Sequence, residues 1–247
     1  MARSSAGALA RAIYSPSEVA SYLRAVAPDT GLVPGPAQVF GWVRRGLLAP
    51  AFRLAPEHAI VADFDDLVTG RAISLFRAAG IPLARIAEAE SFFAGLYGVE
   101  RPFAHRHFWM SGDDIFGTLD GRPIAGTRGG QLAMPFMAQP RHRVETRLVF
   151  DARSGRPTVW TPMAGIELRP AVQAGQPCVA GTAILTTSVA RHVRSGASSE
   201  LVAGRLGLAE TDVEAALTWE CALARRAARS GFLRPPTDRD SHAPCGA

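Results

Sequence analysis

The sequence predicts an α+β fold with a winged helix-turn-helix at the N-terminal end, a small antiparallel β-sheet in the centre and a three-helix, helix-turn-helix-like module at the C-terminal end. Apolar residues recur at helical spacing up to about residue 100 and again from about Thr187. Between these regions, glycines alternate with short apolar stretches, which is typical of hairpins. We therefore divide the chain into residues 13–104, 105–164 and 165–226, followed by a flexible tail, 227–247.

Two short helices open the first segment. Ser15-Pro16-Ser17-Glu18 has the pattern of a capping box with proline at the first helical position. A loop rich in proline and glycine follows, and a second short helix then places four apolar residues on one expected buried face: Val39, Phe40, Val43 and Leu47. Gln38, Arg44 and Arg45 fall away from that face, and Trp42 lies at its border.

Residues 49–61 are expected to be irregular, and two further helices follow, one at 64–76 and one from Ile81. This order is typical of a winged helix-turn-helix, in which a short helix with a cationic outer face enters the major groove and the wing contacts flanking phosphates. The candidate DNA-binding residues are Gln38, Trp42, Arg44 and Arg45, with Arg53 and His58 in the wing. Alternatively, Arg44 and Arg45 are only the solvated end of a helix, where positive charge is favourable, and Trp42 is core.

Three segments resemble the DNA-binding domain of the MerR family: residues 46–50, 64–67 and 75–86. They are similar, in this order, to the turn after the recognition helix, the start of the third helix and the closure of the helix-turn-helix. The resemblance covers about residues 13–93 and implies DNA binding. The long dimerising helix and ligand pocket of that family do not follow, which argues against a small-molecule sensor of its type.

The central segment carries two hairpin signals. Asp120-Gly121 is a two-residue turn between short apolar stretches. Residues 147–150 and 157–160 flank a second turn, which runs from Asp151 to Gly155. These signals predict a small antiparallel sheet.

Three helices are expected in the C-terminal segment, the second capped by Ser198 and the third by Thr211. The third helix carries four acidic residues that repel phosphate: Glu210, Asp212, Glu214 and Glu220. DNA contact by this segment would therefore come from Arg191, Arg194 and Arg205. The alternative, a dimerisation or interaction unit, stays open.

The motifs at residues 175–184, 196–201 and 212–217 resemble a small helical family known by a domain-of-unknown-function label. The resemblance covers about residues 165–224, although the arginine of the family's G-x-P-x-[IV]-x-G-T-R-I signature is Ala183 here. Within that family, the longer form with a MerR-like front is similar to VapB-type antitoxins. The resemblance therefore implies two tasks: neutralising a PIN-domain ribonuclease toxin and repressing the protein's own operon.

The tail has a composition that suits contact with such a toxin. PIN nucleases cluster acidic side chains around metal ions, and an arginine on an extended segment with an apolar anchor can pair with those carboxylates. Arg229, Phe232, Leu233 and Arg234 are the candidate toxin-binding residues. The alternative is an ordinary frayed terminus.

The remaining features argue against an enzyme. The net charge of +5 suits binding to nucleic acid. Every basic residue other than histidine is arginine, as expected of a high-GC genome. A single arginine is therefore weaker evidence for recognition of phosphate or carboxylate. His105 and His107 lack a third ligand at suitable spacing, and no nucleophile motif or phosphate loop occurs. We expect a cytoplasmic homodimer with no catalytic residues, cofactor, metal or membrane contact, whose partners are operator DNA and a cognate PIN-domain toxin. The alternative is a stand-alone MerR-like transcriptional regulator without a toxin partner.

Overall fold

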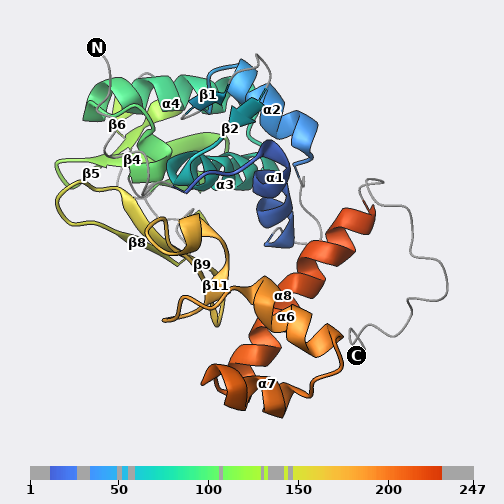
Figure 1. The fold of residues 1–247 in the computed structure, drawn as a ribbon. Coiled ribbons are helices and arrows are strands. Elements are labelled where there is room, and N and C mark those ends of the chain that lie inside the picture. Colours follow the sequence, from blue (N-terminus) through green and yellow to red (C-terminus); the bar gives the residue numbers. More distant parts are fainter. Residues whose placement is uncertain are drawn as a thin grey trace. The chain divides into compact units, whose positions relative to one another are not determined.

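The computed structural model describes residues 12–26, 34–48, 52–54, 59–105, 108–128, 131–132, 142–143 and 147–229 (Figure 1). The fold is mixed α+β, as the sequence predicts. Contacts divide the chain into two compact units. The N-terminal unit holds the described residues from 13 to 158 except 24–26. The C-terminal unit holds those from 159 onward, and residues 12 and 24–26 are grouped with it. The division falls inside strand β9 (Pro157–Met163).

The N-terminal unit begins with helices and a short hairpin, in the order α1 (Pro16–Ala25), α2 (Pro36–Arg44), β1 (Phe52–Leu54), β2 (Ala59–Val61), α3 (Phe64–Ala78) and α4 (Leu83–Tyr97). The capping box that the sequence predicts is present, because Ser15 Oγ accepts a hydrogen bond from the Glu18 N–H at 3.2 Å and Glu18 Oε2 accepts one from the Ser15 N–H at 2.7 Å. α3 begins in the same way at Asp63, whose carboxylate accepts from the Asp66 N–H at 2.9 Å.

The prediction that residues 49–61 are irregular is wrong for two short stretches. β1 and β2 pair antiparallel, with Arg53 opposite Ile60. Each strand has three residues, too few to show an alternating pattern, and Pro50 and Pro56 in the sequence favour irregular backbone.

The predicted apolar face of α2 is confirmed in part: Val39 and Leu47 are buried and Val43 is half-buried. Val39 and Trp42 are buried, whereas Phe40, expected inside, is 39% exposed. Trp42 packs against α3 near Gly70: a Cβ on Gly70 would lie at van der Waals distance, 3.8 Å, from Trp42 Cζ3 and closer, at 3.3 Å, to Leu23 Cδ1. Val39 and Trp42, three residues apart, therefore lie on the side of α2 that faces the core.

The centre of the unit is a sheet preceded by the short helix α5 (Pro102–His105). Five antiparallel strands pair in the order β6 (Gln131–Leu132), β5 (Arg122–Ala125), β4 (Asp114–Leu119), β3 (Trp109–Ser111) and β7 (His142–Arg143). The predicted turn joins β4 to β5, with Asp120 and Gly121 both at positive φ, 48° and 76°. The second predicted hairpin is also confirmed: β8 (Leu148–Phe150) leads into β9 through a turn in which the Asp151 N–H donates to the Arg156 carbonyl.

Helix α4 packs against this sheet through Phe93. The Phe93 ring contacts Phe108 edge-on at a centroid distance of 4.9 Å and stacks on Tyr97 at 5.6 Å. It fits because Gly117 on β4 and Gly126, which begins the 3₁₀ turn η2 (Gly126–Arg128), have no side chain. A Cβ on Gly117 would lie 2.8 Å from Phe93 Cε1, and one on Gly126 would clash with the same ring.

The C-terminal unit has a small antiparallel sheet and three helices. β10 (Ile166–Leu168) pairs with β9 and with β11 (Cys178–Val179), and the 3₁₀ turn η4 (Gln173–Gly175) lies between β10 and β11. α6 (Thr186–Arg194) and α7 (Ser199–Leu206) both pack on α8 (Glu210–Arg229), with Val189, Val202 and Trp219 buried among them (Figure 1). The cap predicted at Ser198 is confirmed, since Ser198 Oγ accepts from the Leu201 N–H at 3.2 Å. The cap predicted at Thr211 is wrong, because α8 already begins at Glu210.

Helix α8 is longer than predicted and continues to Arg229, into the segment expected to be a tail. Residues 230–247 lie outside the described part of the chain. Within the described part, no helix is both long enough and apolar enough to cross a membrane.

Candidate nucleic-acid interface

The outer face of α2 carries Gln38, Arg44 and Arg45, all exposed. Gln38 Oε1 accepts a hydrogen bond from the Gly35 N–H at 3.0 Å, which ties this oxygen to the first turn and leaves the amide NH₂ as a donor. Arg44 lies in the last turn and Arg45 directly after it, where the helix dipole favours cations. The face therefore presents hydrogen-bond donors and positive charge on a short helix.

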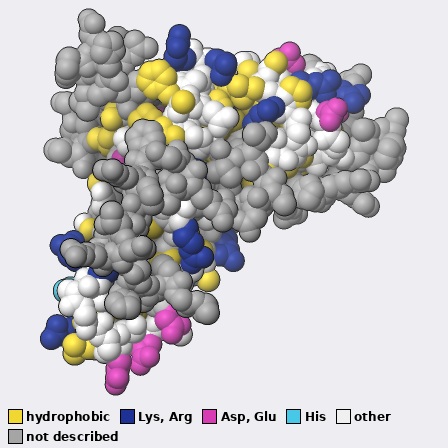
Figure 2. All heavy atoms as spheres, turned by 90° about the vertical axis from the view of Figure 1, so that its right-hand side faces the viewer, with side chains coloured by type: hydrophobic (Ala, Val, Ile, Leu, Met, Phe, Trp, Pro, Cys, Tyr) yellow, Lys and Arg dark blue, Asp and Glu magenta, His cyan; other side chains and the backbone are white. Residues whose placement is uncertain are grey.

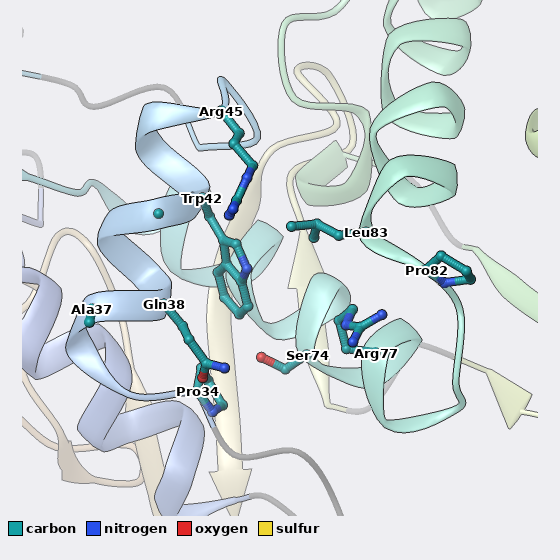
Figure 3. A pocket seen from close by; sticks show the side chains of 10 residues that line it. Pro34, Ala37, Gln38, Trp42, Arg45, Ser74, Arg77, Pro82 and Leu83 are labelled. Atoms are coloured by element: carbon teal, nitrogen blue, oxygen red, sulfur yellow. The ribbon is translucent and has the colours of Figure 1, made fainter.

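Trp42 does not belong to that outer face. The residue is only 6% exposed, so it offers little surface to a DNA groove. Its indole instead lines a cavity of about 610 Å³ between α2, the end of α3 and the start of α4 (Figure 3). Arg45, Arg77, Ser74 and Leu83 also line this cavity.

Behind α2, the start of α3 is held by a buried cluster of charges. The Arg101 guanidinium lies 2.6 Å from Asp63 Oδ1 and 3.3 Å from Asp66 Oδ1. Asp65 pairs with Arg156 at 2.6 Å and lies 3.6 Å from His105 Nε2. Arg101 and His105 belong to the segment around α5 and Arg156 to the β8–β9 hairpin, so the cluster joins two segments distant in sequence to the start of α3.

Two carboxyl groups in this region are held partly protonated. Burial, with Asp63 adding to it, raises the pKa of Asp66 to about 7. Burial likewise raises the pKa of Glu90 to about 8, against the opposing pull of Arg101. Burial also moves the pKa of Asp65 upward, but hydrogen bonds from His105 and Arg156 outweigh it and leave that pKa below its ordinary value.

The buried Glu90 gives the stability of the unit a pH dependence. The folded protein keeps a proton that the unfolded chain releases, so the free energy of unfolding falls as the pH rises from about 4.5 to about 8. We expect Glu90→Gln to remove part of this fall and to be more stable than the wild type at pH 8, by on the order of 3 kcal/mol, with little difference near pH 4.5. Urea unfolding at a series of pH values measures the difference, and a difference that does not grow with pH would contradict the assignment.

The C-terminal unit offers a second set of exposed arginines: Arg191 and Arg194 on α6 and Arg205 on α7. Figure 2 shows acidic side chains gathered at one end of this helical part. Of the acidic residues predicted to repel phosphate, Glu210 and Glu214 are exposed on α8. Glu220 is engaged elsewhere, since its Oε1 accepts from the Thr186 hydroxyl at the start of α6 at 2.6 Å.

The signature loop before α6 is fixed by polar contacts within the same unit. Thr182 Oγ1 donates to the Val179 carbonyl at 2.8 Å, Glu167 Oε2 accepts from the Gly181 N–H at 3.2 Å, and Arg169 donates to the Thr182 carbonyl. Ala183, which stands at the position of the signature arginine, is exposed. A longer side chain there would project from a well-anchored loop.

The structure does not bring all the predicted site residues together. Arg53 lies in β1, its side chain outside the description, and His58, Phe232, Leu233 and Arg234 lie outside the described residues. Arg229 is the last residue of α8. Among the described residues, no group of three or more His, Cys, Asp or Glu side chains is arranged to hold a metal ion. The buried charge cluster and the cavity were not predicted, because both join residues far apart in the sequence.

The described chain is thus an α+β protein with a cationic helix face in one unit and a β-sheet with three helices in the other. The model of a protein family of unknown function, DUF433, matches residues 166–219, within the expected C-terminal module. Among solved structures, the chain is similar to Rv2018 from Mycobacterium tuberculosis, with a TM-score of 0.58 and 20% identity over 83% of this chain and 96% of that chain. At that identity the likeness concerns the fold. No curated protein matches the chain.

Proposed function

We propose that the protein is a DNA-binding regulator of the antitoxin type, which represses its own operon and neutralises a PIN-domain ribonuclease. The observation that carries the DNA-binding part is the outer face of α2. Arg44 and Arg45 are exposed there and have no carboxylate partner among the described residues, so their charge is available to phosphate. The order α1, α2, β1, β2, α3, α4 suits a winged helix-turn-helix in which α2 enters the major groove.

The toxin-binding part of the proposal has a different support. It rests on the resemblance of the two ends of the chain to the MerR-like and C-terminal parts of VapB-type antitoxins, together with the match of the C-terminal unit to DUF433. The exposed arginines of α6 and α7 make that unit a second DNA-contacting or dimerising surface. We place the action of the protein in the cytoplasm, as a homodimer on its own operator.

Deleting residues 230–247 tests the toxin-binding part and leaves α8 complete up to Arg229. The truncated protein should still shift a DNA fragment from upstream of its gene, yet fail to rescue growth when co-expressed with the nuclease encoded beside it. In the full chain, Phe232→Ala with Arg234→Ala should lose the rescue in the same way, whereas the matched pair Asp238→Ala with Asp240→Ala should retain it. Full rescue by the truncated protein would show that the tail is not the inhibitor.

A stand-alone regulator without a toxin is the second candidate, and the cavity under α2 favours it, because a ligand bound there would touch the same helix that meets DNA. Gene order separates the two. A reading frame for a PIN-domain nuclease that abuts this gene supports the antitoxin, and its absence would leave the stand-alone regulator.

A further inference from the structure

We propose that the cavity between α2, α3 and α4 binds a small organic anion with a planar ring. Arg45 comes from the end of α2 and Arg77 from α3, and both line the cavity, whereas no acidic residue among those described does (Figure 3). Neither arginine forms an ion pair with any described residue. Two guanidinium groups that no described carboxylate neutralises, both lining one cavity, attract an oxyanion and can hold it through charge-assisted hydrogen bonds.

The two arginines are positioned by local structure. Arg77 donates through Nη1 to the Ile81 carbonyl at 2.8 Å, which fixes its guanidinium at the turn between α3 and α4. Arg45 folds back along its own helix, where Gly41 leaves room: a Cβ at position 41 would lie 3.3 Å from Arg45 Nη1. Figure 3 shows the Arg45 side chain running down beside the Trp42 ring.

The start of α4 adds to the positive potential. This helix has 15 residues, and Pro82, at its N-cap, provides no side-chain hydrogen bond. No acidic residue lies in its first turn. The N–H groups of that turn therefore reinforce the charge of Arg45 and Arg77.

The other walls suit an apolar ring. The Trp42 indole forms one side and the Leu83 side chain points toward it (Figure 3). The volume of about 610 Å³ falls in the range of small-molecule sites, roughly 300–1,000 Å³, and is far larger than a single phosphate group needs. A conjugated or aromatic carboxylate uses both the cationic and the apolar walls, whereas a DNA backbone phosphate would use only the former.

Occupancy of the cavity has a consequence that rests on the proposed function. Arg45 lines the cavity and also belongs to the face of α2 that we propose for DNA. A carboxylate held inside keeps Arg45 turned inward and neutralises its charge, so the ligand and operator DNA compete for the same guanidinium. By linkage, the ligand weakens operator binding as much as DNA weakens ligand binding. The protein would then be a repressor released by an acidic metabolite.

Calorimetry with 1-naphthoate tests the site in the absence of DNA. We expect saturable binding to the full chain, much weaker binding of the neutral 1-naphthamide, and at least tenfold weaker binding of 1-naphthoate by Arg45→Gln and by Arg77→Gln. Arg122→Gln, which changes an exposed arginine on β5, should bind like the wild type. Arg77→Gln removes the hydrogen bond to the Ile81 carbonyl and could unfold the protein. Arg45 is exposed, so Arg45→Gln should stay folded and provides the test in that case. No binding at millimolar 1-naphthoate, or equal binding by all the arginine variants, would overturn the proposal.

Two further measurements distinguish an organic anion from a phosphate group in the cavity, and ligand binding in the cavity from DNA binding by α2. Inorganic phosphate that displaces 1-naphthoate at comparable concentration would assign the cavity to a phosphate group, such as one of the DNA backbone, and would overturn the organic-anion assignment. In gel shifts on the upstream DNA, 1-naphthoate should weaken binding by the wild type and leave the residual binding of Arg77→Gln unchanged. Binding of 1-naphthoate without any DNA binding would contradict the proposed function alone, and DNA binding without 1-naphthoate binding would contradict the cavity assignment alone.

Discussion

Replacing Arg44 and Arg45 together by alanine should lower the affinity for the operator by on the order of 10- to 100-fold and reduce the slope of log K against log salt by about two. Each arginine that neutralises a phosphate releases about one condensed counterion from DNA, so the slope counts the lost contacts. Both residues are exposed, and the substitutions should therefore leave the fold intact. Fluorescence anisotropy with DNA from upstream of the gene, at several salt concentrations, measures both quantities.

A second pair of arginines provides a charge-matched control. Arg122 and Arg153 are exposed in hairpins of the same unit, away from α2, and their replacement by alanine changes the net charge by the same amount. That variant should keep the wild-type slope within about half a unit. If both double variants lose the same amount of affinity, binding reflects only net charge. If the variant that lacks Arg44 and Arg45 keeps the wild-type salt slope, α2 is not part of the DNA interface. Replacing Arg191, Arg194 and Arg205 in the same assay tests the C-terminal unit.

Replacing Arg101 by methionine should destabilise the N-terminal unit by about 3–5 kcal/mol, the loss typical of a buried ion pair that loses one partner. The arginine contacts Asp63 and Asp66 and lies 4.0 Å from Asp65, and all three aspartates are at most 5% exposed. Arg101 lowers the pKa of Asp66, so without the arginine that pKa in the folded state rises further above its ordinary value. The deficit should therefore be largest near pH 8 and shrink as the pH falls toward 5. Urea unfolding at the two pH values measures it.

Arg156 supplies the contrast for this prediction. It also pairs with Asp65 at 2.6 Å, but its side chain is 43% exposed. Water screens such a pair, so Arg156→Met should cost no more than about 1 kcal/mol. Equal losses from the two substitutions, or a deficit for Arg101→Met that does not depend on pH, would mean that side-chain packing and not charge explains the loss.

The features that the sequence predicts well depend on neighbouring residues. Three such features are the capping box at Ser15 and Glu18, the cap at Ser198 and the Asp120-Gly121 turn. Each depends on residues within four positions, so the sequence alone can predict it. The buried side of α2 was harder to predict. Both Phe40 and Trp42 are aromatic, and the choice between them depends on packing against other helices, such as the approach of Trp42 to α3 near Gly70.

The buried charge cluster at the start of α3 and the cavity beside α2 depend on pairs of residues that lie far apart in the chain. Asp63 and Arg101 are 38 positions apart, and Asp65 and Arg156 are 91 apart. Asp65 and Asp66 look like ordinary first-turn acids of a helix, since nothing beside them in the sequence shows that they are buried. The cavity likewise needs the turn of α2 over α3, which follows from packing between helices.

The contact of Phe93 with Gly117 and Gly126 places these three positions under a shared evolutionary constraint. The ring occupies the space that a methyl group on either glycine would need. In related chains, alanine at one glycine position should therefore accompany a smaller residue in place of phenylalanine, and the three columns of an alignment should vary together. Divergence at this point requires paired changes, so this junction between helix and sheet should change slowly.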